Sequence, residues 1–151
     1  MEIEFNQLPP SENKIRIIRV MKGRPGGMAY TKEATNYKKD FKKHMLDVYA
    51  ADIVKFAAGH SPCATYEVRI DLFFTKEQLV NSGWPNTKTY YKKMDVGNRR
   101  KLLEDCIAEV LGIDDLYTFD LRLVKQVTDQ EGPYVKVTIE QRNHTDYGIT
   151  L

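Results

Sequence analysis

Three sets of residues around one expected helix could carry out chemistry on a phosphate group. A carboxylate, Asp95, stands shortly before the helix, and a cation, Lys101, stands in its first turn. Two further carboxylates, Asp114 and Asp115, follow just past its expected end. Carboxylates bind hard cations such as Mg²⁺, and basic residues hold a phosphate backbone. This order of residues suggests a metal-dependent phosphodiesterase, with ordinary solvated charges at the two helix ends as the alternative.

Each of these residues has an expected role in such chemistry. A carboxylate-held Mg²⁺ activates water near neutral pH and stabilises negative charge on the phosphorus oxygens. Lys101 is within reach of a phosphate held at Asp95, where it would neutralise transition-state charge. Asn98 would cap the helix or contact the substrate. We therefore expect Asp95, Lys101 and Asp115 to be catalytic, and Asp95, Asp114 and Asp115 to be the metal ligands.

Basic residues are grouped along the chain, although 23 Lys and Arg against 21 Asp and Glu leave a net charge of only +2. Residues 14–24 contain no acidic residue, and residues 38–43 and 88–101 contain one each, while 10 of the 21 acidic residues lie from 104 onward. A protein that binds a polyanion beside a carboxylate site shows this distribution, as can a mixed surface. The residues expected to bind nucleic acid are Lys14, Arg16, Arg19, Arg24, Lys92, Lys93, Asn98, Arg99 and Arg100.

Composition narrows the class of protein. With 42% hydrophobic and 29% charged residues, the 151-residue chain fits one soluble globular domain. No apolar run approaches the roughly 18–20 residues that cross a bilayer, and the acidic, alternating start is not a secretory signal, so we expect a cytoplasmic protein without a membrane partner. Cys63 and Cys106 form no CxxC motif and the histidines lack metal-ligand spacing, which argues against a zinc site.

Hydrophobic periodicity predicts the elements that position these residues. Alternation predicts a strand over 2–8, and a β-branched, basic run predicts another over 14–21. Glycines and a proline at 23–27 predict a turn or flexible loop, after which the strand can resume at 28–30. Thr31 is a suitable N-cap for a helix that runs to about residue 58. The face of this helix expected to be buried carries Tyr37, Phe41, Met45, Val48, Ala51 and Val54.

A strand and a long loop are expected in the middle of the chain. The strand covers 64–74, and the loop covers 75–94 with a helical turn near 77–80. The apolar face of the strand carries Tyr66, Val68, Ile70 and Leu72. In the loop, Trp84, Tyr90 and Tyr91 alternate with Lys88, Lys92 and Lys93. Aromatic rings among cations either stack nucleic-acid bases or attach the loop to the rest of the protein.

The C-terminal part predicts two strands, 119–128 and 134–141, joined as a hairpin around 129–133. Residues 143–151 show no clear pattern and are expected to form a tail. Strands and helices alternate irregularly, so the predicted class is α+β. We expect a single domain over 1–151, with a mixed β-sheet and two main helices.

The second main helix is expected over 98–111, with Asn98 as N-cap, Gly112 at its C-terminal end, and a buried stripe that includes Cys106. At 1.5 Å per residue it would be about 21 Å long. Asp95 and Asp115 lie three or four residues beyond its ends, and each arm reaches about 10–14 Å at most. One metal ion shared within a chain would need both arms folded back. The sequence therefore predicts either a composite site across a two-fold dimer or a helix that breaks early.

The chain resembles the RusA family of Holliday-junction resolvases, small dimeric endonucleases often carried by prophages. Residues 8–14, Leu-Pro-Pro-Ser-Glu-Asn-Lys, resemble the family's N-terminal segment, and residues 30–33, Tyr-Thr-Lys-Glu, followed by Tyr37, resemble the start of its first helix. The family's most specific pattern is Asp-x-Asp-Asn-x-x-Lys, a helix, and a closing Asp-Asp. It is matched here by Asp95, Asn98, Lys101, Asp105, Asp114 and Asp115.

This resemblance implies a RusA-like fold and a homodimer. It also implies a Mg²⁺-dependent endonuclease that resolves four-way junction DNA by paired symmetric nicks in recombination and repair. In the family, two aspartates of the first motif and one of the closing pair hold the metal, and the lysine assists. By resemblance these roles fall on Asp95, on Asp114 or Asp115, and on Lys101.

One position departs from the family pattern. The second aspartate of the first motif falls on Gly97, which offers no side-chain ligand. A water molecule can fill the vacant position, since Mg²⁺ commonly keeps several waters. Alternatively, the chain is a catalytically weak or inactive protein that binds junctions. A third possibility is a neighbouring carboxylate, for which the candidates are Asp71, Glu104 and Asp105.

Overall fold

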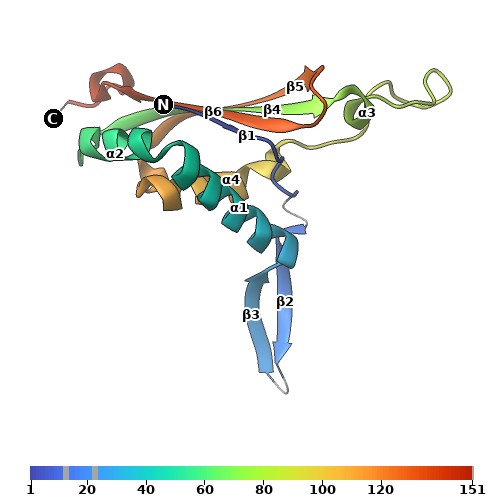
Figure 1. Ribbon diagram of the computed structural model, residues 1–151, viewed down its shortest axis with the longest axis horizontal. Coiled ribbons are helices and arrows are strands. Elements are labelled where there is room, and N and C mark those ends of the chain that lie inside the picture. The colour runs from blue at the N-terminus through green and yellow to red at the C-terminus, as the bar shows by residue number, and fades with distance from the viewer. Residues whose placement is uncertain (12–13, 22–23, 151) are drawn as a thin grey trace. The chain divides into compact units, whose positions relative to one another are not determined.

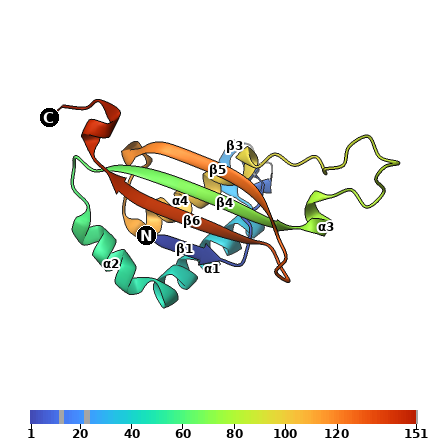
Figure 2. The same cartoon turned by 90° about the horizontal axis from the view of Figure 1, so that it is seen from above.

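The protein is described here from a computed structural model, which covers residues 1–11, 14–21 and 24–150 (Figures 1 and 2). Within the strands, the side chains of residues 17–21 and 24–28 lie outside this description. The chain divides into two compact units, each assembled from separated stretches of sequence. We call them the sheet unit (Met1–Leu8, Ser61–Val96 and Leu116–Leu151) and the helical unit (Pro9–His60 and Gly97–Asp115).

The sheet unit is built on a four-stranded mixed sheet with the strand order β1-β6-β4-β5. Strand β6 is antiparallel to both of its neighbours, whereas β5 runs parallel to β4. Together with the helices described below, this confirms the predicted α+β class with a mixed sheet. The bounds of the strands are β1 Glu2–Phe5, β4 Thr65–Thr75, β5 Thr118–Thr128 and β6 Tyr134–Arg142.

The predicted hairpin between the last two strands is wrong, because β4 lies between β5 and β6. Residue Ile70 of β4 pairs with Leu123 on one side and with Val137 on the other. The connection at 129–133 must cross two strand spacings, about 9–10 Å, which five residues span easily. A short connection therefore permits a hairpin without requiring it. Here the mostly buried strand β4 lies between the two strands that the connection joins.

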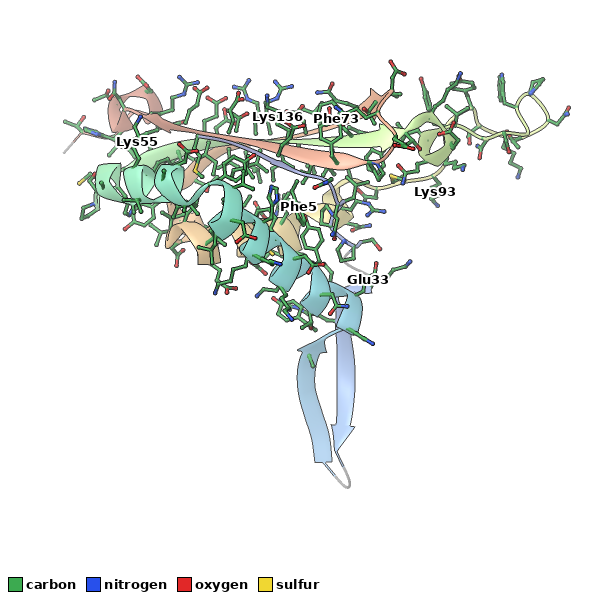
Figure 3. The ribbon with its side chains drawn as sticks, viewed as in Figure 1. Phe5, Glu33, Lys55, Phe73, Lys93 and Lys136 are labelled. Atoms are coloured by element: carbon green, nitrogen blue, oxygen red, sulfur yellow. The ribbon has the colours of Figure 1, made fainter. Side chains whose placement is uncertain are left out.

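The two faces of the sheet differ in chemistry. As predicted, Tyr66, Val68, Ile70 and Leu72 of β4 are buried on one face, where β6 adds Val135, Val137 and Ile139. Figure 3 shows Phe5 on this face, and Phe73 and Lys136 on the opposite one. The opposite face carries ion pairs, among them Arg142 with Glu67 at 2.7 Å and Lys136 with Glu2 at 3.1 Å.

In the helical unit, strands β2 (Arg16–Met21) and β3 (Arg24–Tyr30) form an antiparallel pair. The turn or flexible loop predicted at 23–27 is therefore wrong for the described residues 24–27, which belong to β3: Arg24 pairs with Met21 and Pro25 pairs with Val20. Gly26 and Gly27 lie where the register of the pair shifts, a β-bulge or irregularity that glycine tolerates because its backbone is permissive.

The first long helix is interrupted, contrary to prediction. Helix α1 covers Lys32–Val48 and helix α2 covers Ala50–Gly59, with a break at Tyr49. Thr31 is the N-cap as predicted, because its hydroxyl oxygen accepts a hydrogen bond from the Ala34 amide at 3.2 Å. The break ends the buried face, so three predicted core residues are exposed: Val48, Ala51 and Val54.

The second main helix, α4 (Arg100–Leu111), contacts both α1 and α2. A 3₁₀ turn, η2 (Gly97–Arg99), precedes it, so Arg99 occupies the N-cap position that the sequence predicted for Asn98. The predicted buried stripe is confirmed for Leu102, Leu103, Cys106, Ile107 and Leu111, and Val110 is half-buried.

Three short helices complete the description: α3 (Lys76–Leu79), η3 (Asp115–Tyr117) and η4 (His144–Tyr147). Helix α3 confirms the helical turn predicted within the long loop. In the part of the chain that the structure describes, no helix has the length and apolar character needed to cross a membrane. The single domain expected over 1–151 stays a prediction.

Candidate active site

Lys101 is the centre of a charged cluster on helix α4. Its ammonium nitrogen lies 3.0 Å from Asp105 Oδ1, one helical turn later, and 3.7 Å from Asp115 Oδ2, beyond the helix end. The hydrogen bond to Asp105 raises the pKa of Lys101 and outweighs its partial burial. Lys101 therefore remains a cation across the physiological pH range, held between two carboxylates.

The approach of Asp115 to Lys101 depends on a chain reversal after α4. Gly112 adopts a left-handed conformation, with φ of 66°, and its amide donates to Ala108 O at 2.9 Å. The Ile113 amide donates to the same oxygen at 3.2 Å, and its side chain is buried. The residues that follow therefore run back along the helix, so Asp115 meets the first helical turn instead of pointing away from the far end.

This reversal changes the geometry assumed from the sequence. Helix α4 has 12 residues and starts two residues later than predicted, after the 3₁₀ turn. The arm that carries Asp115 folds back onto the helix through local hydrogen bonds, so it is not strained. For the arm that carries Asp115, a site within one chain is therefore no more strained than a composite site in a dimer. The dimer itself stays a prediction.

A surface pocket of about 250 Å³ surrounds this cluster within the helical unit. Four carboxylates and one lysine line it, together with a small apolar floor. The lining residues are Lys101, Glu104, Asp105, Ala108, Ile113, Asp114 and Asp115. Carboxylate oxygens are the ligands that Mg²⁺ prefers, and the Lys101 ammonium already lies where two of these carboxylates converge. The donor chemistry of the pocket therefore fits a hard cation.

Two candidates for the missing ligand lie in this pocket. Glu104 is mostly buried, with 19% of its side chain exposed, and pairs with Arg100 at 3.1 Å. Burial raises the pKa of Glu104, and the nearby positive charges of Arg100 and Lys101 oppose that shift. Asp105 accepts a hydrogen bond from the Tyr30 hydroxyl at 3.3 Å in addition to its contact with Lys101.

The third candidate, Asp71, belongs to the sheet unit and is fully engaged there. Arg69 Nε and Nη2 donate to its two oxygens at 2.8 and 3.0 Å, and Gln126 donates at 2.6 Å. These hydrogen bonds, the one from Arg69 first, lower the pKa of Asp71 despite its burial. Because both oxygens are already used, Asp71 is a poorer metal ligand than Glu104 or Asp105.

The predicted ligands are exposed but are not assembled into a metal centre. Asp95 lies near the end of a stretch of the sheet unit, and Asp114 and Asp115 lie at the end of the helical unit. Among the described residues, no group of three or more His, Cys, Asp or Glu side chains is arranged to hold a metal ion. Gly97 opens the turn η2 and contributes only backbone.

The residues predicted to bind nucleic acid fall into several environments. Lys14, Arg16 and Lys93 are exposed, whereas Arg99 is half-buried and donates to Pro9 O, and Arg100 pairs with Glu104. The Lys92 ammonium donates to Glu77 O, and Asn98 is half-buried. The side chains of Arg19 and Arg24 lie outside the described residues. For all nine, DNA contact stays a prediction.

The sequence did not single out two residues that organise the cluster. The Tyr30 ring lies under Lys38, 5.0 Å from its ammonium, and its hydroxyl reaches Asp105. Glu109 joins α4 to α1 through Lys38 at 3.2 Å and Lys42 at 3.0 Å. Two lysines of the basic stretch at 38–43 are therefore used inside the unit. In the sequence, only the opposite charges on the two amphipathic helices indicated the ion pairs of Glu109 with Lys38 and Lys42.

The chain matches a known protein family over most of its length. A family model described as Endodeoxyribonuclease RusA matches residues 9–140. The matched span contains α1, α4, the motif from Asp95 to Lys101 and the closing aspartate pair. No curated protein matches the chain.

Proposed function

Because the chain belongs to the RusA family of endodeoxyribonucleases, we propose that it is a Mg²⁺-dependent resolvase that makes paired nicks in four-way DNA junctions. The observation that carries this proposal is the pocket on α4, where Lys101 contacts both Asp105 and Asp115. A site that cuts a phosphodiester needs oxygen ligands for a metal and a cation for the phosphate. Both lie within this pocket.

In this proposal Asp95, Asp114 and Asp115 hold the metal ion, with Asp95 assigned from the family motif. Bound Mg²⁺ would supply an activated water and stabilise negative charge on the phosphorus. Lys101 provides a fixed positive charge for a non-bridging phosphate oxygen. Its contacts with Asp105 and Asp115 orient the ammonium before a substrate arrives, so little reorganisation is needed when charge develops.

We further propose that Glu104 or Asp105 supplies the ligand lost at Gly97. Both line the same pocket as Asp115, whereas Asp71 is held by Arg69 and Gln126. This supports an active enzyme over the alternative, a protein that binds junctions without cutting them. Asp105 also meets Asp115 at the Lys101 ammonium, so it lies close to one of the closing aspartates.

The homodimer belongs to the proposal as well. A four-way junction has approximate two-fold symmetry, and an isologous dimer presents two equivalent sites to it. Exposed cations such as Lys14, Arg16 and Lys93 would contact the phosphates of the arms. Binding that relies on such contacts weakens steeply as salt rises, because each counterion released into more concentrated salt gains less entropy.

The test is Mg²⁺-dependent nicking of a synthetic four-way junction by the wild-type chain, Asp95→Asn and Gly97→Asp. Asp129→Asn is a matched control, because Asp129 is an exposed loop carboxylate outside the matched motif. We expect the wild type and the control to cut, and Asp95→Asn to bind the junction without cutting it.

Other outcomes favour other functions. Binding without cleavage by the wild type, with cleavage appearing in Gly97→Asp, would identify a junction-binding protein that has lost one metal ligand. If none of the variants binds the junction, the nucleic-acid function itself is wrong.

A further inference from the structure

The segment after α3 forms an ordered loop that projects beyond the end of the sheet (Figures 1 and 2). We call residues 81–91 the aromatic loop. Its two ends are joined by an isolated antiparallel bridge between Val80 and Tyr91. The Asn81 amide donates to Tyr90 O at 2.9 Å, and the Lys92 amide donates to Leu79 O at 2.7 Å. The base of the loop is therefore closed like a short hairpin.

Hydrogen bonds also organise the interior of the aromatic loop. Asn81 Nδ2 donates to Thr89 O at 2.7 Å and to Tyr91 O at 3.3 Å. The Thr89 hydroxyl donates to Tyr91 O at 2.8 Å, and the Thr87 hydroxyl donates to Thr89 O at 2.9 Å. A loop with these internal bonds loses less conformational entropy when a ligand binds than a disordered one would.

Three aromatic rings are displayed on this loop. Trp84 packs edge-to-face on Tyr90, with ring centroids 5.9 Å apart, and Tyr90 packs in the same way on Tyr91, at 4.9 Å. Their exposed fractions are 50%, 39% and 61%, respectively, so the rings contact one another but keep much of their surface in water. The alternative expected from the sequence, rings that attach the loop to the protein, does not explain this exposure.

The charged residues around these rings are all basic. Residues 81–94 contain Lys88, Lys92 and Lys93 and no acidic residue. Lys88 and Lys93 are exposed, whereas Lys92 donates to Glu77 O and helps to hold the base of the loop. Figure 3 marks Lys93 where the chain leaves the loop. Exposed aromatic rings among cations bind nucleic acid whose bases are available for stacking.

We propose that Trp84, Tyr90 and Tyr91 form a stacking platform for nucleobases exposed at the crossover of a four-way junction, with Lys88 and Lys93 holding the adjacent phosphates. This rests on the proposed function, because the crossover is where continuous base stacking is interrupted. Regular duplex offers no free base faces, so the platform would favour the branch point over the arms. It lies outside the carboxylate pocket and adds a specificity site to the enzyme.

Tryptophan fluorescence reports on the aromatic loop, because Trp84 is the single tryptophan of the chain. The wild-type protein would be titrated without Mg²⁺, so that the DNA stays intact, with a fluorescein-labelled four-way junction and with a linear duplex of the same sequence. Anisotropy measures binding, and tryptophan emission measures contact at the loop. We expect the junction to quench Trp84 emission in step with the anisotropy, and bound duplex to leave the emission almost unchanged.

Variants then measure the contribution of the rings. One base stacked on one aromatic ring corresponds to about 5- to 150-fold in affinity. We expect Trp84→Leu and Tyr91→Leu to lose junction affinity within that range and to keep duplex affinity. Phe119→Leu is the matched control, because Phe119 is an exposed aromatic of the same unit, with an exposed fraction of 46%. Its junction affinity should equal that of the wild type.

Three results would overturn the platform. Junction binding with unchanged Trp84 emission, and with wild-type affinity in Trp84→Leu, would reject it and leave the proposed function intact. A change of Trp84 emission with protein concentration, in the absence of DNA, would assign the loop to a contact between copies of the chain. No junction binding by the wild type would reject both the platform and the proposed function.

Discussion

Lys101 is held between two carboxylates in the structure. Its ammonium lies 3.0 Å from Asp105 and 3.7 Å from Asp115, and these contacts orient the charge on the rigid first turn of α4. A substrate phosphate would exchange part of this pairing for its own oxygens.

Lys101→Ala should lower kcat for junction nicking by about 10²- to 10³-fold, the usual effect of removing one preorganised group that stabilises transition-state charge. Junction affinity should change much less, because one cation among many is removed. The comparison is with Lys55→Ala, an exposed lysine of α2. Single-turnover nicking and anisotropy separate the two effects. A kcat within threefold of the wild type would remove Lys101 from the mechanism.

Asp71→Asn should destabilise the protein by about 1–3 kcal/mol at pH 7, because the buried Asp71 carboxylate loses its charge-assisted pair with the exposed Arg69. Asp120→Asn, which breaks a more exposed pair with Arg122, should cost about 0–1 kcal/mol. Urea unfolding monitored by circular dichroism measures both. Equal losses for the two variants would contradict the structural role of Asp71.

The same carboxylate predicts a pH dependence. The pKa of Asp71 is lowered in the folded state, so its stabilising contribution is complete above the ordinary pKa of an aspartate. The contribution is lost as the pH falls from there through the lower, folded value. The difference in unfolding free energy between wild type and Asp71→Asn should therefore shrink under acid conditions. A difference that grows as the pH falls would contradict a lowered pKa of Asp71 in the folded state.

At the scale of elements, the reversal after α4 is the feature that places Asp115. Gly112 is left-handed there, and a Cβ added to it would meet nothing within 4 Å. The cost of a side chain is therefore conformational strain, not a steric clash. The reversal in turn depends on the Ala108 carbonyl, which accepts from both Gly112 and Ile113.

Gly112→Ala should destabilise the fold by about 1–2 kcal/mol, the cost of a left-handed alanine, and should lower nicking because the closing aspartates shift. Gly59→Ala is the matched control: a Cβ there also has open space, and Gly59 is not left-handed. Thermal unfolding and the nicking rate are the measurements. Equal melting temperatures for the two variants would show that the reversal tolerates a side chain.

At the scale of the whole molecule, the open question is whether one chain or two build each site. The predicted helix placed Asp95 and Asp115 far apart, which favoured a composite site in a dimer. In the structure, Asp115 instead contacts the first helical turn, six residues after Asp95 in the sequence. We therefore expect the Asp115 arm to complete a site within its own chain, whereas Asp95, which belongs to the sheet unit, is assigned to that site from the family motif alone.

Mixing two inactive variants tests this expectation. Asp95→Asn and Asp115→Asn each disable a site, and in a within-chain site every protomer of the mixture stays inactive. In a composite site, a mixed dimer would regain one intact site and nick one strand of the junction. We expect no recovery after subunit exchange. Single nicks at up to about a quarter of the wild-type number of sites would establish the composite arrangement instead, by the statistics of random two-fold pairing.

Much of this molecule follows from the sequence alone. The α+β class, the strand faces, the Thr31 cap, the buried stripe of α4 and the cysteine buried in it were all predictable. Each depends on side chains a few residues apart, which periodicity and capping rules describe. Membership of the RusA family was likewise recognisable from the sequence, and the family model matches residues 9–140.

Only the tertiary structure decided the rest. It put β4 between β5 and β6, broke the first helix at Tyr49, paired residues 24–27 as a strand, and turned Asp115 back onto Lys101. These features depend on partners that are distant in sequence or on a single backbone conformation, and hydrophobic spacing carries no information about either. The elements could therefore be predicted from the chain, while the carboxylate cluster around Lys101 required the folded arrangement.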